Sequence, residues 1–79
     1  MIKKFSKEIE GTAFEFNPMN ILKLQLFQIY VTHGDTRHRF HMELTQEGVF
    51  KITDRVNCPA EYLPFEEAFS NAILTEGEQ

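Results

Sequence analysis

The stretch ILKLQLFQIYVTH at residues 21–33 is the longest apolar run in this chain of 79 residues, and it decides the fold that we predict. Its first half has leucine at alternate positions (22, 24 and 26), the pattern of a half-buried strand. Its second half continues the alternation one position out of phase, with Phe27, Ile29 and Val31. Such a shift is what a β-bulge produces, so we predict a central strand over residues 21–33 with a bulge at Leu26 and Phe27.

A helix is the competing interpretation of the same stretch. Leu22, Leu26, Ile29 and Tyr30 would share one face of such a helix. The second half, however, is rich in β-branched and aromatic residues, which favour strands. We therefore predict a strand.

Two turn signals place the next strands against this one. Gly34-Asp35 as a two-residue turn pairs Ile29 with Phe40, and the three-residue loop 46–48, which ends in glycine, pairs Met42 with Ile52. The apolar phases of all three strands then coincide on one face of the sheet, as a half-buried hairpin requires.

The N-terminal residues predict a further hairpin around Glu10-Gly11. Its register sets Phe5 opposite Phe16, which suits a buried face, but it also sets Lys7 opposite Phe14.

A helix is predicted over residues 64–76. Pro64 suits the first helical position, and Phe65, Phe69, Ala72 and Ile73 form one apolar stripe that we expect to cover the apolar sheet face. The predicted fold is α+β, a small antiparallel β-meander of four to five strands with one C-terminal helix packed on one face. We expect residues 1–79 to form a single domain.

Composition narrows the class of protein. The chain is 42% hydrophobic with eight phenylalanines, and its one cysteine, Cys58, allows no disulfide framework. No apolar stretch is long enough for a signal peptide or a membrane span, so we expect a soluble, cytoplasmic protein without membrane contact. All eight Lys and Arg precede residue 56, whereas five Glu and no base follow it. The overall charge of −4 argues against nucleic acid as the main partner.

The polar face of the predicted sheet is the first candidate binding surface. An exposed tyrosine with basic neighbours could contact single-stranded nucleic acid by stacking and phosphate pairing. We favour the alternative that this face is a solvated surface, in which Glu43 pairs with Lys51 across two strands. The candidate face comprises Gln28, Tyr30, Arg37, Arg39, His41, Lys51 and Arg55.

Metal and catalytic chemistry have weaker signals. His33, His38 and Cys58 could approach one another, but three ligands at irregular spacing fall short of a structural zinc site. No nucleophile motif or phosphate loop is present. We therefore expect no metal, no cofactor and no catalytic activity.

Protein association is the positive hypothesis that we place first. An open sheet leaves edges that a strand of another copy or of a partner could extend. Four large residues exceed what one covering helix needs: Met19, Tyr62, Leu63 and Leu74. We expect a protein-interaction or structural module, with weak single-stranded nucleic acid binding as the alternative.

Overall fold

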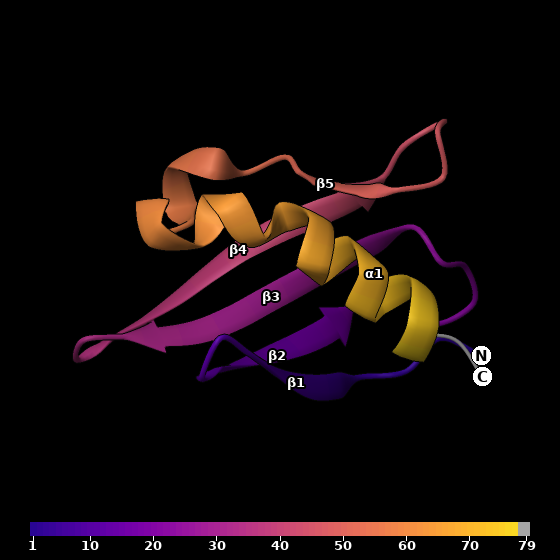
Figure 1. Ribbon diagram of the computed structural model, residues 1–79. Helices are drawn as coiled ribbons and strands as arrows, with labels where there is room; N and C mark the ends of the chain where they lie inside the picture. The colour runs from indigo at the N-terminus through magenta and orange to yellow at the C-terminus, as the bar shows by residue number, and fades with distance from the viewer. Residues whose placement is uncertain (78–79) are drawn as a thin grey trace.

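The computed structural model describes residues 1–77, which form a five-stranded antiparallel sheet with one α-helix lying across it (Figure 1). The strands pair in chain order: β1 (Phe5–Ile9), β2 (Thr12–Pro18), β3 (Leu26–His33), β4 (Thr36–Leu44) and β5 (Phe50–Ile52). Two 3₁₀ helices follow, η1 (Arg55–Asn57) and η2 (Ala60–Phe65), and then α1 (Glu66–Glu76). The predicted α+β meander is confirmed. Within residues 1–77, no helix has the length and apolar character needed to cross a membrane.

The predicted hairpin registers are all observed. Phe5 lies opposite Phe16, and Ile29 lies opposite Phe40. In the first hairpin, Glu10 has φ 52° and Gly11 has φ 80°, the left-handed pair that a type I′ turn requires. Turn chemistry close in sequence therefore fixes which side chains face the core.

Lys7, the one charged residue that the register places opposite a core ring, finds a partner on the helix. Its Nζ lies 2.8 Å from a carboxylate oxygen of Glu76, while Phe14 beneath it is buried. Because β1 is an edge strand, the lysine stem can pass the rim of the sheet and keep its amine in water.

The prediction is wrong for the first half of the central strand. Strand β3 begins at Leu26, residues 21–25 form a loop, and Leu22 is 88% exposed. The pairing of β3 with β4 is continuous along the whole strand, so no bulge interrupts it. The change of phase marks the place where the strand starts.

The physical reason is that the neighbouring strands run out. Strand β2 ends at Pro18 and β4 ends at Leu44. The carbonyl of Gln25 still accepts the N–H of Leu44, but residues 21–24 have no strand to pair with. The N-terminal segment lies beside the loop instead: Ile2 is buried, and its N–H donates to the carbonyl of Ile21 at 2.9 Å. Of the three leucines, Leu24 is partly buried and packs against the core, and Ile2 adds a buried side chain from the N-terminal segment.

The helix covers the apolar face of the sheet as predicted, but it begins later. Pro64 lies inside η2, and α1 starts at Glu66. Phe69, at the centre of the predicted stripe, is fully buried and meets Phe14 with ring centroids 4.8 Å apart. Because six of the largest buried side chains are phenylalanines, edge-to-face ring contacts supply much of the core packing.

Candidate interaction surfaces

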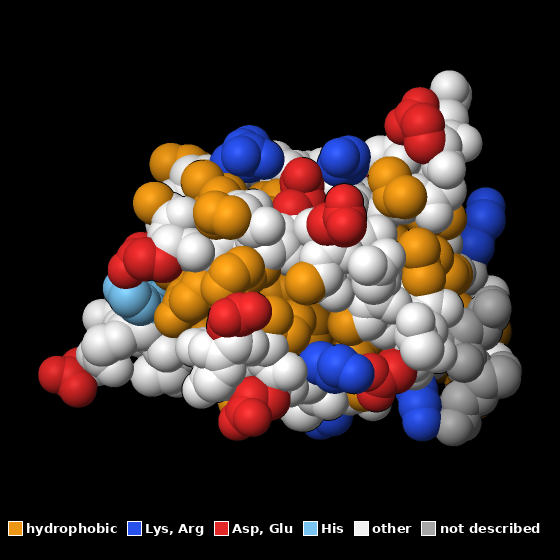
Figure 2. Space-filling model, viewed as in Figure 1, with side chains coloured by type: hydrophobic (Ala, Val, Ile, Leu, Met, Phe, Trp, Pro, Cys, Tyr) orange, Lys and Arg blue, Asp and Glu red, His pale blue; other side chains and the backbone are white. Residues whose placement is uncertain are grey.

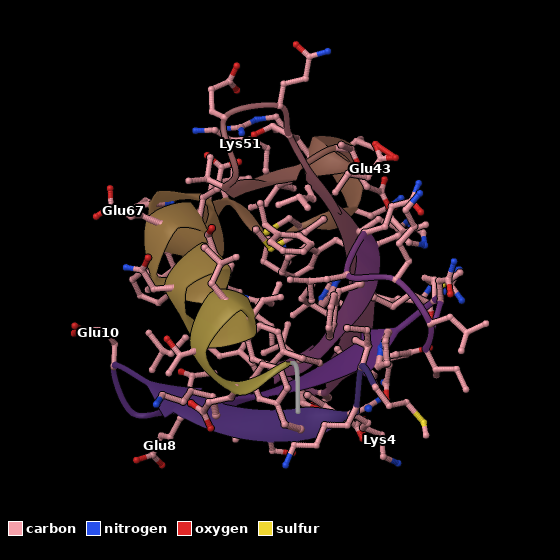
Figure 3. The ribbon with its side chains drawn as sticks, turned by 90° about the vertical axis from the view of Figure 1, so that its right-hand side faces the viewer. Lys4, Glu8, Glu10, Glu43, Lys51 and Glu67 are labelled. Carbon is pink, nitrogen blue, oxygen red and sulfur yellow. The ribbon has the colours of Figure 1, made fainter. Side chains whose placement is uncertain are left out.

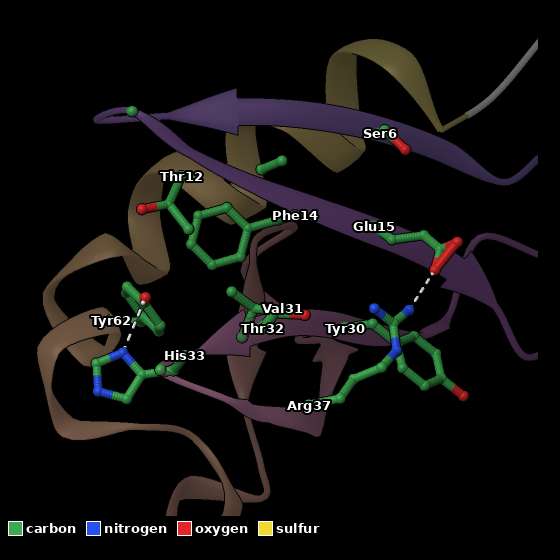
Figure 4. Close-up of a pocket in the computed structure, with 13 residues that line it drawn as sticks. Ser6, Thr12, Phe14, Glu15, Tyr30, Val31, Thr32, His33, Arg37 and Tyr62 are labelled. Atoms are coloured by element: carbon green, nitrogen blue, oxygen red, sulfur yellow. Dashed lines mark hydrogen bonds and ion pairs between the residues drawn. The ribbon is translucent and has the colours of Figure 1, made fainter.

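Tyr30 lies at the centre of the outer sheet face, which is the face opposite the helix. The guanidinium of Arg37 sits 4.8 Å from the centre of its ring and is 2.7 Å from a carboxylate oxygen of Glu15 (Figure 4). Three strands thus contribute to one stack of a carboxylate, a guanidinium and a ring. The charge of Arg37 is therefore paired with Glu15 and its flat face with the Tyr30 ring, both within the same chain.

A line of hydrogen bonds continues from Tyr30 across the same face. The tyrosine hydroxyl donates to Gln28 Oε1 at 3.1 Å, and Gln28 Nε2 lies 3.4 Å from His41 Nε2. His41 Nδ1 lies 3.0 Å from Asp54 Oδ2, which fits an Nδ1–H that donates to this carboxylate. Asn57 donates to the other oxygen of Asp54 at 2.7 Å. Every polar group in this line therefore has a partner.

The predicted face is only partly assembled. Five of its members share the outer surface of β3 and β4 in the predicted register, namely Gln28, Tyr30, Arg37, Arg39 and His41. Arg55, predicted as a member of this face of the sheet, lies outside the sheet, because β5 ends at Ile52 and Arg55 begins η1. The Arg55 guanidinium lies 3.6 Å from Glu66.

Lys51 is also drawn away from the outer face. It lies opposite Glu43 in the ladder, as predicted, but its Nζ is 3.7 Å from Glu66 on the helix. Figure 3 shows the two side chains diverging. Among the cations predicted for this face, Arg39 alone has no carboxylate partner within residues 1–77.

A shallow groove opens between β2 and β3. Their ladder ends at Glu15 and Tyr30, and the two strands separate beyond this point (Figure 4). The groove between them has a volume of about 620 Å³. Phe14 and Tyr62 lie at its inner side, in edge contact with ring centroids 5.2 Å apart. The groove is wide open to solvent. Small-molecule sites usually enclose most of the ligand, so this shape gives little support for one.

Among the residues considered for metal binding, His33 has other partners and Cys58 is buried. His33 Nε2 lies 2.8 Å from Glu61, and its Nδ1 lies 3.2 Å from the Tyr62 hydroxyl. The Cys58 thiol is buried, and burial raises its pKa to about 11, against the opposing effect of Arg55. Within residues 1–77, no three His, Cys, Asp or Glu side chains gather as a metal site.

The two edges of the sheet differ in a way that the sequence did not indicate. At β5, the N–H of Phe50 donates to the Ser70 hydroxyl and the N–H of Ile52 donates to Glu66, both at 2.8 Å. The helix therefore supplies acceptors to the outward N–H groups of this edge. A further strand cannot pair there without displacing these side chains.

The β1 edge has no such cover. Ile9 and Thr12 flank a two-residue turn and form a hydrogen-bonded pair, so the alternate residues Ser6 and Glu8 direct their backbone groups away from β2. No partner for these groups occurs within residues 1–77, and no other segment runs along this side of β1 (Figure 1). This is the open edge of the sheet.

Exposed apolar side chains gather at one end of the molecule. Backbone contacts bring the contributing segments together: the N–H of Leu44 donates to the carbonyl of Gln25, and Ile2 bonds to Ile21, both at 2.9 Å. Figure 2 shows apolar side chains at the right, between the end of α1 and the β4–β5 loop. We call this surface the apolar end; it comprises Met1, Met19, Ile21, Leu22, Leu44, Val49 and Leu74.

The sequence indicated this surface only in part. Met19 and Leu74, predicted as surplus to the core, do belong to the apolar end. Tyr62 is buried and Leu63 packs against the core, so these two predictions of surplus residues are wrong. Leu22 was missed because the leucine alternation was assigned to a strand.

Comparison of the chain with protein-family models, with curated proteins and with solved structures finds no significant match.

Proposed function

We propose that this chain is a protein-interaction module without catalytic activity, and that the apolar end is the surface that binds its partner. The observation that carries the proposal is the distribution of exposed large apolar side chains. Seven of the eight within residues 1–77 lie at the apolar end, and Val56 is the exception. Single exposed apolar residues are ordinary on a protein surface, but a cluster of them is typical of an interface.

The surroundings of the apolar end favour a partner of particular chemistry. Lys3 and Lys23 are exposed beside it and have no ion-pair partner within residues 1–77. A partner segment with apolar side chains and flanking Asp or Glu would complement both features, because charged rims steer association while the apolar centre holds it. We place the protein in the cytoplasm, since its single cysteine is buried as a free thiol.

Single-stranded nucleic acid binding, the alternative, has less support. Arg37 is held by Glu15, and Lys51 and Arg55 are both near Glu66. A phosphate would have to displace these carboxylates, which leaves Arg39 as the cation most available to it. Stacking of a base on Tyr30 would likewise displace the Arg37 guanidinium.

A capture experiment with matched variants tests the proposal. Leu22→Asp places a charge in the apolar end, whereas Val56→Asp makes the same change in η1, outside the apolar end. The two side chains are 88% and 92% exposed, so neither variant disturbs the core. The tagged wild type and the Val56→Asp variant should retain the same partner from cell extract, and Leu22→Asp should lose it. The proposal is contradicted if the two variants capture equal amounts of the partner. It is also contradicted if neither variant captures more than the tag alone does.

A further inference from the structure

We propose that two copies of this chain pair through antiparallel β1 strands, with a two-fold axis passing at Ser6. This interface is separate from the apolar end and does not depend on the function proposed above. It joins the two five-stranded sheets into one continuous sheet.

The backbone argument begins with the difference between the two sheet edges. Ser6 and Glu8 direct free N–H and C=O groups outward from β1, whereas the outward N–H groups of Phe50 and Ile52 on β5 are taken by the helix. A β1-to-β5 contact would build an open chain of molecules, and the covered β5 edge opposes it. The remaining arrangement is β1 against β1, which closes as a symmetric dimer.

The side chains on the outer face of β1 choose the register. With the axis at Ser6, Lys4 of each copy lies directly opposite Glu8 of the other, which gives two cross-strand pairs of opposite charge. Neither side chain has an ion-pair partner within residues 1–77. Figure 3 shows both pointing away from the body of the molecule. They are therefore available to a second copy.

Neighbouring registers are less favourable. With the axis at Lys7, the two Lys7 side chains would lie opposite each other, and with the axis at Glu8, the two carboxylates would do so. Like charges directly opposite on paired strands are destabilising. The register at Ser6 has no opposed like charges.

The inner face agrees with this register. Phe5 is only partly buried, although it stacks on Phe16 with ring centroids 4.6 Å apart. In the dimer its exposed side lies opposite Lys7 of the second copy, whose ammonium is already held by Glu76. The methylene groups of that lysine can then cover the ring.

The size of the contact sets the expected strength. A five-residue strand pair buries less than the roughly 1,000 Å² that a stable interface needs, so we expect reversible dimerisation at micromolar or higher protein concentration. Sedimentation velocity over a concentration series at low ionic strength measures this directly. The wild type should shift from monomer to dimer and no further.

A charge-exchange experiment tests the register. Lys4→Glu alone and Glu8→Lys alone each place like charges opposite each other twice, so each variant should raise the dimer dissociation constant about tenfold or more. An equimolar mixture restores both pairs of opposite charge and should form the heterodimer. Because this recovery needs only mixing, it also shows that both variants fold.

Backbone substitution provides an independent test. Ser6→Pro removes the outward N–H at the axis but leaves the ladder to β2 intact, and should abolish the dimer, whereas Ser6→Ala should keep it. The proposal is overturned by a wild type that stays monomeric throughout, by larger assemblies, or by a mixture that forms no heterodimer. It is also overturned if Leu22→Asp abolishes self-association while Lys4→Glu does not.

Discussion

Replacing Ser70 by alanine removes the hydroxyl that covers the β5 edge. Ser70 is 2% exposed, and its Oγ accepts the N–H of Phe50 at 2.8 Å. Phe50 is itself buried, so water cannot easily replace the lost acceptor. Leaving a buried donor without a partner costs about 1–3 kcal/mol of folding free energy.

The helix partly offsets this loss. Alanine is a better helix former than serine by about 0.5 kcal/mol, so the net destabilisation should be about 0.5–2.5 kcal/mol. For a domain of this size, that corresponds to a decrease in Tm of roughly 2–20 °C. Urea unfolding followed by circular dichroism measures the free-energy change, and a thermal scan gives the Tm.

Thr75→Ala is the matched control. It makes the same gain in helix propensity at an exposed position of α1, so its stability should stay within about 0.5 kcal/mol of the wild type. If Ser70→Ala also stays within that range, the Ser70 hydroxyl does not stabilise the β5 edge. That result would contradict the claim that the helix covers β5 while β1 is open.

Other regions give independent predictions. Phe69→Ala should destabilise the fold by about 3–5 kcal/mol in urea unfolding, because its fully buried ring contacts rings from β2 and β4; a loss below about 2 kcal/mol would contradict the central place of this ring in the core. The Cys58 thiol, with its pKa raised to about 11 from 9.0, should hold roughly 100-fold less thiolate at pH 8 than an exposed cysteine and react correspondingly slowly with a thiol reagent until urea unfolds the chain; fast labelling of the native protein would count against its burial. The same shift predicts that the free energy of unfolding decreases from about pH 9 to pH 11, because the folded state holds the proton that the unfolded thiol releases, and Cys58→Ala should remove that part of the pH dependence. For nucleic acid, fluorescence anisotropy with single-stranded oligonucleotides at low salt should show no binding by the wild type; salt-dependent binding that Arg39→Glu abolishes would instead support the polar sheet face as a site.

Local rules correctly predicted most of the sheet. The turns at Glu10-Gly11, Gly34-Asp35 and residues 46–48 lie next to the strands that they join, so their chemistry fixes the pairing without information from the rest of the chain. The apolar stripe of the helix through Phe69 and Ile73 was also predicted from residues close together in the sequence, and both side chains are buried. Such features depend on spacing that can be read along the sequence.

The failures came where distant segments meet. The strand pattern before Leu26 could not show that β2 and β4 end before reaching it, or that the N–H of Ile2 donates to the carbonyl of Ile21. The assignment of Arg55 to the sheet failed because β5 ends at Ile52 and the chain turns into η1, where the Arg55 guanidinium lies 3.6 Å from Glu66 of the helix. Each of these contacts joins residues more than ten positions apart.

The candidate surfaces show the same division. Alternation along β3 and β4 correctly predicted the outer face around Tyr30, but it could not show that Glu15 and Asp54 neutralise Arg37 and hold His41. The apolar end combines the N-terminus, two loops and the helix, so no single stretch of sequence reveals it. The open β1 edge becomes visible only once the covered β5 edge is seen beside it.

The most direct test of the proposed function maps the surface that a partner covers. The ¹⁵N-labelled domain, titrated with the partner that Leu22→Asp fails to capture, should show its largest amide shift changes at residues 19–24 and around Leu44, Val49 and Leu74. The amides of Tyr30, Arg37 and Arg39 should stay unchanged. Shift changes centred on those three residues, with residues 19–24 unaffected, would contradict the account and move the interaction to the polar sheet face.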